Sequence, residues 1–272
     1  MSKTKEHLLR ARIFIIDLLF PIRCLGCGVE FEDLEPKERW ICESCLKKVP
    51  IRRIQACPAC EEYSEGGKTH IRCRRKTSLD GLWVSSEYDS KLVSDAIKKL
   101  KFSFVRDISF SLSKIIERSV LEAEEFTEFH DIFLDNFSWT EDEDKYIDEE
   151  KNRRTETVLV PVPLHKKRQN WRGFNQAELI SRNVSERFNI SLVKDTVARV
   201  KNTQPQTKVD TVLRRKENIS GAFLCQDPAL LKNKNVIILD DVSTTLATID
   251  ECAGVIRRSG AKSVWGLVVA RR

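Results

Sequence analysis

The sequence predicts an α/β protein in which a mainly parallel sheet is flanked by helices and preceded by a small cysteine-rich module. Strand-like apolar segments alternate with amphipathic helical segments from residue 79 to residue 272. The segment VIILD at 236–240 is a continuous apolar run, which is typical of a strand covered on both faces. Seven of the nine cysteines lie between residues 24 and 73, in a stretch too short to build a core of its own.

Taken in order, the chain divides into three parts. Residues 1–21 are expected to form an amphipathic helix that packs on the body or lies on a membrane surface, and residues 22–78 form the cysteine-rich module. The α/β domain then occupies residues 79–272. Apolar periodicity predicts strands at 81–89, 157–163, 236–240 and 263–271, and helices at 90–102, 106–125, 175–187 and 248–259.

The net charge of +6 conceals an uneven distribution. Residues 122–150 hold 13 acids and one lysine, which leaves a net charge of +18 on the rest of the chain. A basic body suits phosphates, on a nucleotide or along a nucleic acid, but a solvated face of lysine-rich helices explains it equally well. We expect the acidic stretch, at about 122–156, to be an insertion or a mobile loop.

No segment approaches the roughly 18 apolar residues that a membrane span requires. The first residues also lack the cleavage pattern of a signal peptide. These features predict a cytoplasmic protein, in which paired cysteines are expected to bind metal rather than form disulfides.

The cysteines come in pairs with metal-ligand spacing. Two such pairs supply the four nitrogen or sulfur ligands that Zn²⁺ prefers, and four filled positions indicate a structural site. Sequential pairing of the knuckles is the simplest arrangement, and interleaved pairing is the alternative. The expected ligands of the two zinc ions are Cys24, Cys27, Cys42, Cys45, Cys57, Cys60, His70 and Cys73, while Cys252 is expected to be a buried small hydrophobe.

The strand at 236–240 leads into two adjacent carboxylates, Asp240 and Asp241. Carboxylates at the end of a parallel strand can accept hydrogen bonds from ribose hydroxyls, and a short loop before a helix N-terminus can hold a phosphate. An ordinary capped helix is the alternative interpretation. The candidate phosphate-binding residues of this loop are Ser243, Thr244, Thr245, Leu246, Ala247 and Thr248.

The stretch VIILDDVSTTLAT at 236–248 resembles the phosphoribosyl pyrophosphate (PRPP) loop of type I phosphoribosyltransferases. That resemblance implies that Asp240 and Asp241 bind the ribose hydroxyls and act in catalysis, and that the loop cradles the 5-phosphate. The departure is Leu246, where the family usually has glycine. A leucine held in the left-handed conformation costs about 1 kcal/mol, and its side chain can crowd the anion.

Nearly the whole chain outside the acidic stretch resembles the ComF family, amidophosphoribosyltransferase-like proteins linked to DNA uptake by competent bacteria. The resemblance is carried by LLFPIRCLGCG at 18–28, YDSKLVSDAIKKLKF at 88–102 and VPVPLHKKRQNWRGFNQAELIS at 160–181. Thr203, Gln206, Arg214 and the segment from Asn218 to Phe223 add to it. It implies a type I phosphoribosyltransferase fold behind a double zinc ribbon.

Two basic segments accompany this resemblance. His165, Lys166 and Lys167 follow a strand end, where pyrophosphate can bind in such a fold, and Arg172 is the candidate catalytic cation. For the stretch from Arg172 to Gln176, a structural turn with an Asn175 cap is the alternative interpretation. Residues 199–223 resemble the loop that closes over the site in such transferases, and a basic surface loop is the alternative.

The leading hypothesis is therefore a protein that binds PRPP with Mg²⁺ and, if it is an enzyme, transfers the phosphoribosyl group to a nitrogen nucleophile. The alternative is a non-catalytic accessory protein of DNA uptake or repair that binds a nucleotide or single-stranded DNA. A third hypothesis is an assembly partner that docks on a competence helicase through its zinc module.

Overall fold

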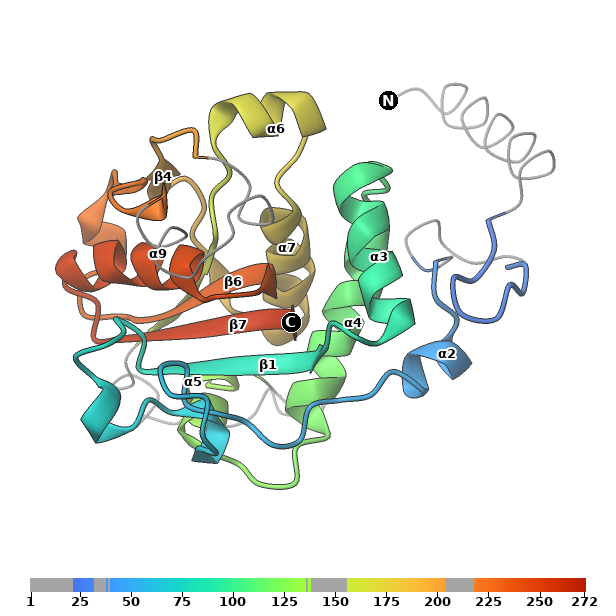
Figure 1. The fold of residues 1–272 in the computed structure, drawn as a ribbon, viewed down its shortest axis with the longest axis horizontal. Helices are drawn as coiled ribbons and strands as arrows, with labels where there is room; N and C mark the ends of the chain where they lie inside the picture. The colour runs from blue at the N-terminus through green and yellow to red at the C-terminus, as the bar shows by residue number, and fades with distance from the viewer. Residues whose placement is uncertain (1–21, 32–37, 39, 136, 138–155, 204–217) are drawn as a thin grey trace, which may run out of the picture.

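The core of the protein is a parallel five-stranded sheet. The computed structural model describes residues 22–31, 38, 40–135, 137, 156–203 and 218–272. Strands β1, β7, β6, β2 and β3 are neighbours in that order, and every pair runs parallel. Figure 1 shows β1, β7 and β6 side by side. The predicted fold class is thereby confirmed. The strand bounds are Gly81–Glu87 (β1), Thr157–Pro161 (β2), Ser191–Leu192 (β3), Asn235–Ser243 (β6) and Ser263–Arg271 (β7).

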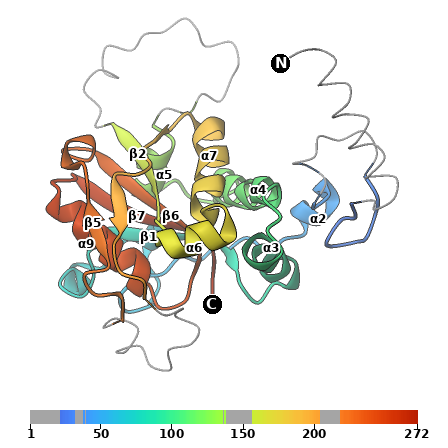
Figure 2. The same ribbon diagram turned by 90° about the horizontal axis from the view of Figure 1, so that it is seen from above.

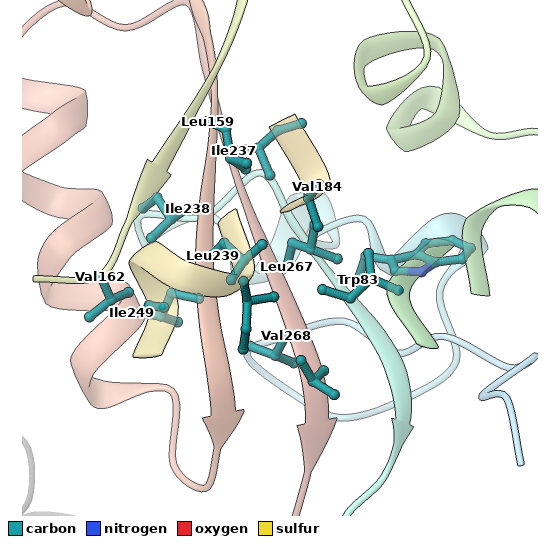
Figure 3. Packing of buried hydrophobic residues seen from close by; sticks show 14 of the residues in the cluster. Trp83, Leu159, Val162, Val184, Ile237, Ile238, Leu239, Ile249, Leu267 and Val268 are labelled. Carbon is teal, nitrogen blue, oxygen red and sulfur yellow. The ribbon is translucent and has the colours of Figure 1, made fainter. Parts of the chain in front are cut away.

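Helices cover both faces of this sheet. Helix α9 (Ala247–Arg258) packs on one face, and α4 (Ile108–Leu121) and α7 (Gln176–Phe188) pack on the other (Figure 2). Helix α3 (Lys91–Phe102) lies against α4. Because both faces are covered, Ile237, Ile238 and Leu239 of β6 are all fully buried (Figure 3), as the continuous apolar run predicts.

Shorter elements complete the described part of the chain. Strands β4 and β5 form a separate antiparallel pair, and α6 connects β2 to α7. No helix among the described residues is long and apolar enough to cross a membrane. The remaining bounds are Glu43–Lys47 (α2), Glu65–Gly67 (η2), Ile71–Cys73 (η3), Glu128–Phe133 (α5), Lys166–Arg172 (α6), Val197–Arg199 (β4), Phe223–Cys225 (β5) and Pro228–Leu230 (η6).

The acidic stretch differs from the expected insertion in its first part, because α5 forms there. Phe129 and Phe133 of this helix are fully buried, and Phe129 stacks on Trp83 with 4.9 Å between ring centroids. Two aromatic anchors outweigh the local density of acids. The rest of the predicted insertion, 138–155, lies outside the described residues, as do the predicted N-terminal helix at 1–21 and residues 204–217 of the basic loop.

Candidate functional site

The cysteine-rich module contains two tetrads of metal ligands. Cys24, Cys27, Cys42 and Cys45 form the first, and Cys57, Cys60, His70 and Cys73 form the second, with the ligand atoms of each tetrad within 4.8 Å of one another. The Sγ atoms of Cys27 and Cys42 are 3.7 Å apart. A tetrahedral Zn²⁺ with bonds of about 2.3 Å requires about 3.8 Å between sulfurs. The tetrads fit zinc, and their grouping is the sequential one.

His70 is placed as a ligand of the second tetrad. Its Nδ1 lies 3.3 Å from Cys60 Sγ, and its Nε2 lies 3.0 Å from the Tyr63 carbonyl oxygen. A hydrogen bond donated by Nε2 to that carbonyl leaves the Nδ1 lone pair directed at the tetrad, as metal-bound histidines require. All nine cysteines are free thiols, and Cys252 is fully buried.

The segment that follows the second tetrad is joined to helix α9 of the α/β domain. The hydroxyl of Thr77 and the backbone N–H of Ser78 both donate to Asp250 Oδ1, at 2.6 and 2.7 Å. Arg257 forms an ion pair with Asp80 at 2.7 Å. Asp250 and Arg257 belong to α9, so the segment after Cys73 holds the helix that follows the predicted phosphate loop.

Asp240 and Asp241 lie near the carboxyl end of β6, which continues to Ser243, three residues beyond the end that the sequence predicts. Asp241 is only 3% exposed, and Lys101 Nζ lies 2.9 Å from its Oδ1. Lys101 is the last residue but one of α3, more than a hundred residues away in sequence. It lies within the LKF segment at 100–102, but nothing there distinguishes it from the neighbouring lysines.

Burial and the adjacent Asp241 carboxylate raise the pKa of Asp240 to about 7, although Lys101 and Arg199 oppose this shift. Asp241 Oδ2 is buried and has no hydrogen-bond partner in the described part of the chain. An adjacent carboxylate pair with spare acceptor capacity can take hydroxyl donors or a hydrated cation.

Three arginines surround this pair. Burial lowers the pKa of Arg199 to about 10, and it lowers the pKa of Arg168 and of Arg172 as well. Asp241 acts in the opposite direction on the pKa of Arg172, and Asp240 on that of Arg199, so each arginine lies within electrostatic range of a carboxylate. Arg168 and Arg199 both donate to Thr203, through its carbonyl and its hydroxyl. Sequence reasoning placed Arg199 only in a basic loop and did not single out Arg168.

The predicted phosphate loop is a tight connection between β6 and α9. Leu246 adopts φ 59° and ψ −11°, the left-handed conformation that a glycine would take without cost. Its side chain is 9% exposed and belongs to the hydrophobic core. The leucine therefore keeps the backbone shape of the loop, and most of its side chain packs inward rather than standing in solvent.

The strand end after β2 combines structural and chemical roles. The ring of His165 caps α6 by accepting a hydrogen bond from the Lys167 backbone N–H at 3.2 Å. Lys166 and Lys167 are exposed, whereas Arg172 is half-buried on the side of Asp241. Asn175 caps α7 and also donates to the Val162 carbonyl at 3.0 Å. The segment is thus a turn with a cap that also carries an arginine toward the carboxylates.

Comparisons with known proteins agree with the zinc tetrads. The family model described as "Double zinc ribbon domain" matches residues 15–75. "Competence protein F" of Haemophilus influenzae is 27% identical over 259 residues, covering 92% of this chain and 98% of that protein. "DNA utilization protein YhgH" of Escherichia coli K12 is 27% identical over 240 residues, covering 82% and 93%.

Two further similarities are more distant. "Competence protein ComFC" of Bacillus subtilis is 26% identical over 258 residues, covering 91% of this chain and 94% of that protein. A solved structure, described as an analysis of an invariant aspartic acid in HPRTs, glutamic acid mutant, covers 62% of this chain and 78% of its own, at 9% identity and a TM-score of 0.30.

Proposed function

We propose that this chain, which belongs to the ComF family, binds a phosphorylated ribose such as PRPP at the carboxyl end of β6. The observation that carries the proposal is a pair of adjacent carboxylates, a half-buried Asp240 and a buried Asp241, near arginines and beside a left-handed turn that opens α9. Ribose hydroxyls need paired acceptors, and a 5-phosphate needs backbone N–H groups at a helix N-terminus. Here both stand on one strand and its following loop.

In this proposal each group has one role. Asp240 and Asp241 accept hydrogen bonds from the ribose hydroxyls, and Thr244, Thr245, Ala247 and Thr248 surround the 5-phosphate. Arg172 lies on the side of Asp241 and would face the pyrophosphate, with Lys166 and Lys167 further out on α6. Mg²⁺ would arrive with PRPP and neutralise part of the pyrophosphate charge. A cytoplasmic location belongs to the proposal, since zinc tetrads need reduced thiols.

If the bound PRPP reacts, the bond between C1 and the pyrophosphate oxygen breaks and a nitrogen nucleophile forms the new bond to C1. The electron pair leaves with pyrophosphate, whose charge Arg172 and the metal would stabilise. Arg172 is half-buried, so it would act on that charge in a medium less polar than bulk water. Release of pyrophosphate in the presence of a nitrogen acceptor is the readout of this step.

Calorimetric titration with PRPP and Mg²⁺ tests binding. We expect saturable heat from the natural protein and at least a tenfold loss of affinity in Asp240→Asn, because the amide has one acceptor instead of two. Asp227→Asn is the matched control, since Asp227 is exposed and caps only the short η6 helix. Absence of heat from the natural protein would exclude the proposal, and equal affinities of the two variants would remove Asp240 from it.

A second candidate function is binding of single-stranded DNA. It is favoured by the net charge of +18 outside the acidic stretch, and by relatives named for competence and DNA utilization. Binding of this kind weakens with rising salt because cations are displaced from the phosphates. A gel shift that shows no complex at low salt would exclude it.

A further inference from the structure

Exposed aromatic side chains gather beside the carboxylate site. Among the described residues five aromatic side chains are exposed as large apolar groups, and three of them, Phe102, Phe104 and Trp171, stand at the end of α3 and on α6. Trp171 is 66% exposed and Phe104 42%. The rings of Phe104 and Trp171 meet edge to face, with 5.3 Å between centroids, where α3 and α6 approach each other (Figure 2).

The backbone at Phe104 is strained. Phe104 has φ 58°, a conformation that is rare for a bulky residue and that a glycine adopts freely. Burial does not offset this cost in the usual way, because Phe104 as a residue remains 42% exposed. Residues held in such sparsely populated backbone conformations cluster at active sites and ligand-binding segments. The position of the Phe104 ring is therefore better explained by contact with a ligand than by packing within the fold.

The aromatic pair is attached to the candidate site from both sides. Lys101, which is paired with Asp241, precedes Phe104 by three residues, and Trp171 is adjacent to Arg172. Arg106 stacks on Phe174 at 5.4 Å, which fixes the 103–107 segment against the turn after α6. The pair therefore lies on the two segments that also carry Lys101 and Arg172, at the rim of the carboxylate site.

The charge around the pair is positive. Lys166 and Lys167 are exposed on the helix that carries Trp171, and Arg106 is exposed in the segment that carries Phe104. Exposed aromatic rings among lysines and arginines are the arrangement with which proteins hold an unpaired base and its phosphates. An apolar protein partner would not need this charge.

We propose that Phe104 and Trp171 form a platform on which an unpaired nucleobase stacks at the rim of the carboxylate site. The platform extends the proposed ribose-phosphate site, because a base bound there lies beside the groups assigned to the sugar. The base can belong to a single-stranded nucleic acid or to a free nucleotide. The chemistry is the same in both cases, and the source is decided by experiment.

Fluorescence anisotropy with a labelled oligothymidylate, and with an abasic strand of the same length, isolates the base from its phosphates. We expect the natural protein to bind the oligothymidylate more tightly than the abasic strand. In Trp171→Ala the affinity for the oligothymidylate should fall about five- to a hundredfold. Binding of the abasic strand is expected to be unchanged. Trp171→Phe keeps a stacking surface and should restore most of the affinity. Phe126→Ala, at another exposed aromatic, is the matched control.

Phe104 gives an independent readout. Phe104→Gly and Phe104→Ala should lose the same factor of affinity, because both lack the ring, but the glycine variant should unfold at the higher temperature. A role in folding alone would change stability without separating the oligothymidylate from the abasic strand.

Competition with thymidine 5′-monophosphate decides the source of the base. Displacement of the labelled strand by the monophosphate indicates a free nucleotide, and failure to displace it indicates a strand. Equal affinity of the natural protein for the two strands, or an unchanged Trp171→Ala variant, would overturn the platform. Calorimetry with PRPP on Trp171→Ala separates the two proposals. PRPP binding reports on the ribose-phosphate site alone, and the difference in affinity between the two strands reports on the platform alone.

Discussion

Leu246 is the residue at which the structure makes its sharpest thermodynamic prediction. It combines a left-handed backbone, with φ 59°, and a side chain that is only 9% exposed. Truncation to alanine removes most of the buried side chain but keeps the backbone cost. The expected loss is about 2 to 3 kcal/mol, at the lower end of buried leucine truncations because the loop can relax.

Glycine at this position reverses the usual order of the two small residues. Leu246→Gly loses the same side chain, but it also releases the roughly 1 kcal/mol that an L-residue spends in the left-handed region. We therefore expect Leu246→Gly to be more stable than Leu246→Ala by about 1 kcal/mol. For a domain of this size that difference corresponds to about 2 to 4 °C in Tm.

The assay is urea or thermal unfolding of the zinc-loaded protein, with Glu186 as the matched control. Glu186 is an exposed residue of α7 in the right-handed helical conformation. At this position the alanine variant should be more stable than the glycine variant by about 1 kcal/mol in free energy of unfolding. If alanine were also the more stable residue at 246, the left-handed conformation of Leu246, and the glycine-like shape of the loop, would be refuted. PRPP affinity should change little in Leu246→Gly, because the backbone donors of the loop remain.

Three further outcomes follow from the same geometry. The raised pKa of Asp240, about 7 against an ordinary value of 3.8, means that the folded protein keeps a proton that the unfolded chain has lost between those values. Stability should therefore fall as pH rises through this window, and Asp240→Asn should be more stable than the natural protein at about pH 8 but not at about pH 4. Denaturation curves that differ equally at both pH values would contradict this. Cys57→Ser should lower the zinc content, measured by atomic emission, from two ions per chain to one. Cys225→Ser, outside both tetrads, should leave the zinc content unchanged. Asn175→Ala should cost about 1 to 3 kcal/mol in urea unfolding, because it removes the α7 cap and leaves the Val162 carbonyl without its partner, and a loss below a few tenths would argue against that double role.

The zinc module shows how far local spacing reaches. Each Cys-x-x-Cys pair brings its own two ligands together, so the ligand types follow from the chain alone. Which pairs share an ion depends on how the knuckles fold against each other, and the sequence left sequential and interleaved pairing open. The structure groups them sequentially. It also ties the segment after Cys73 to Asp250 of α9, a contact between residues far apart in the chain.

The carboxylate site divides in the same way. The sequence by itself determined four of the five strands of the sheet, the helices that flank it, the adjacent Asp240 and Asp241, and the loop before α9, because periodicity and neighbouring residues express them directly. Only the tertiary structure brought Lys101 to Asp241 and placed Arg199 near Asp240. These contacts join distant segments at one sheet edge, where the folding of the whole domain, rather than any local pattern, decides which charges meet.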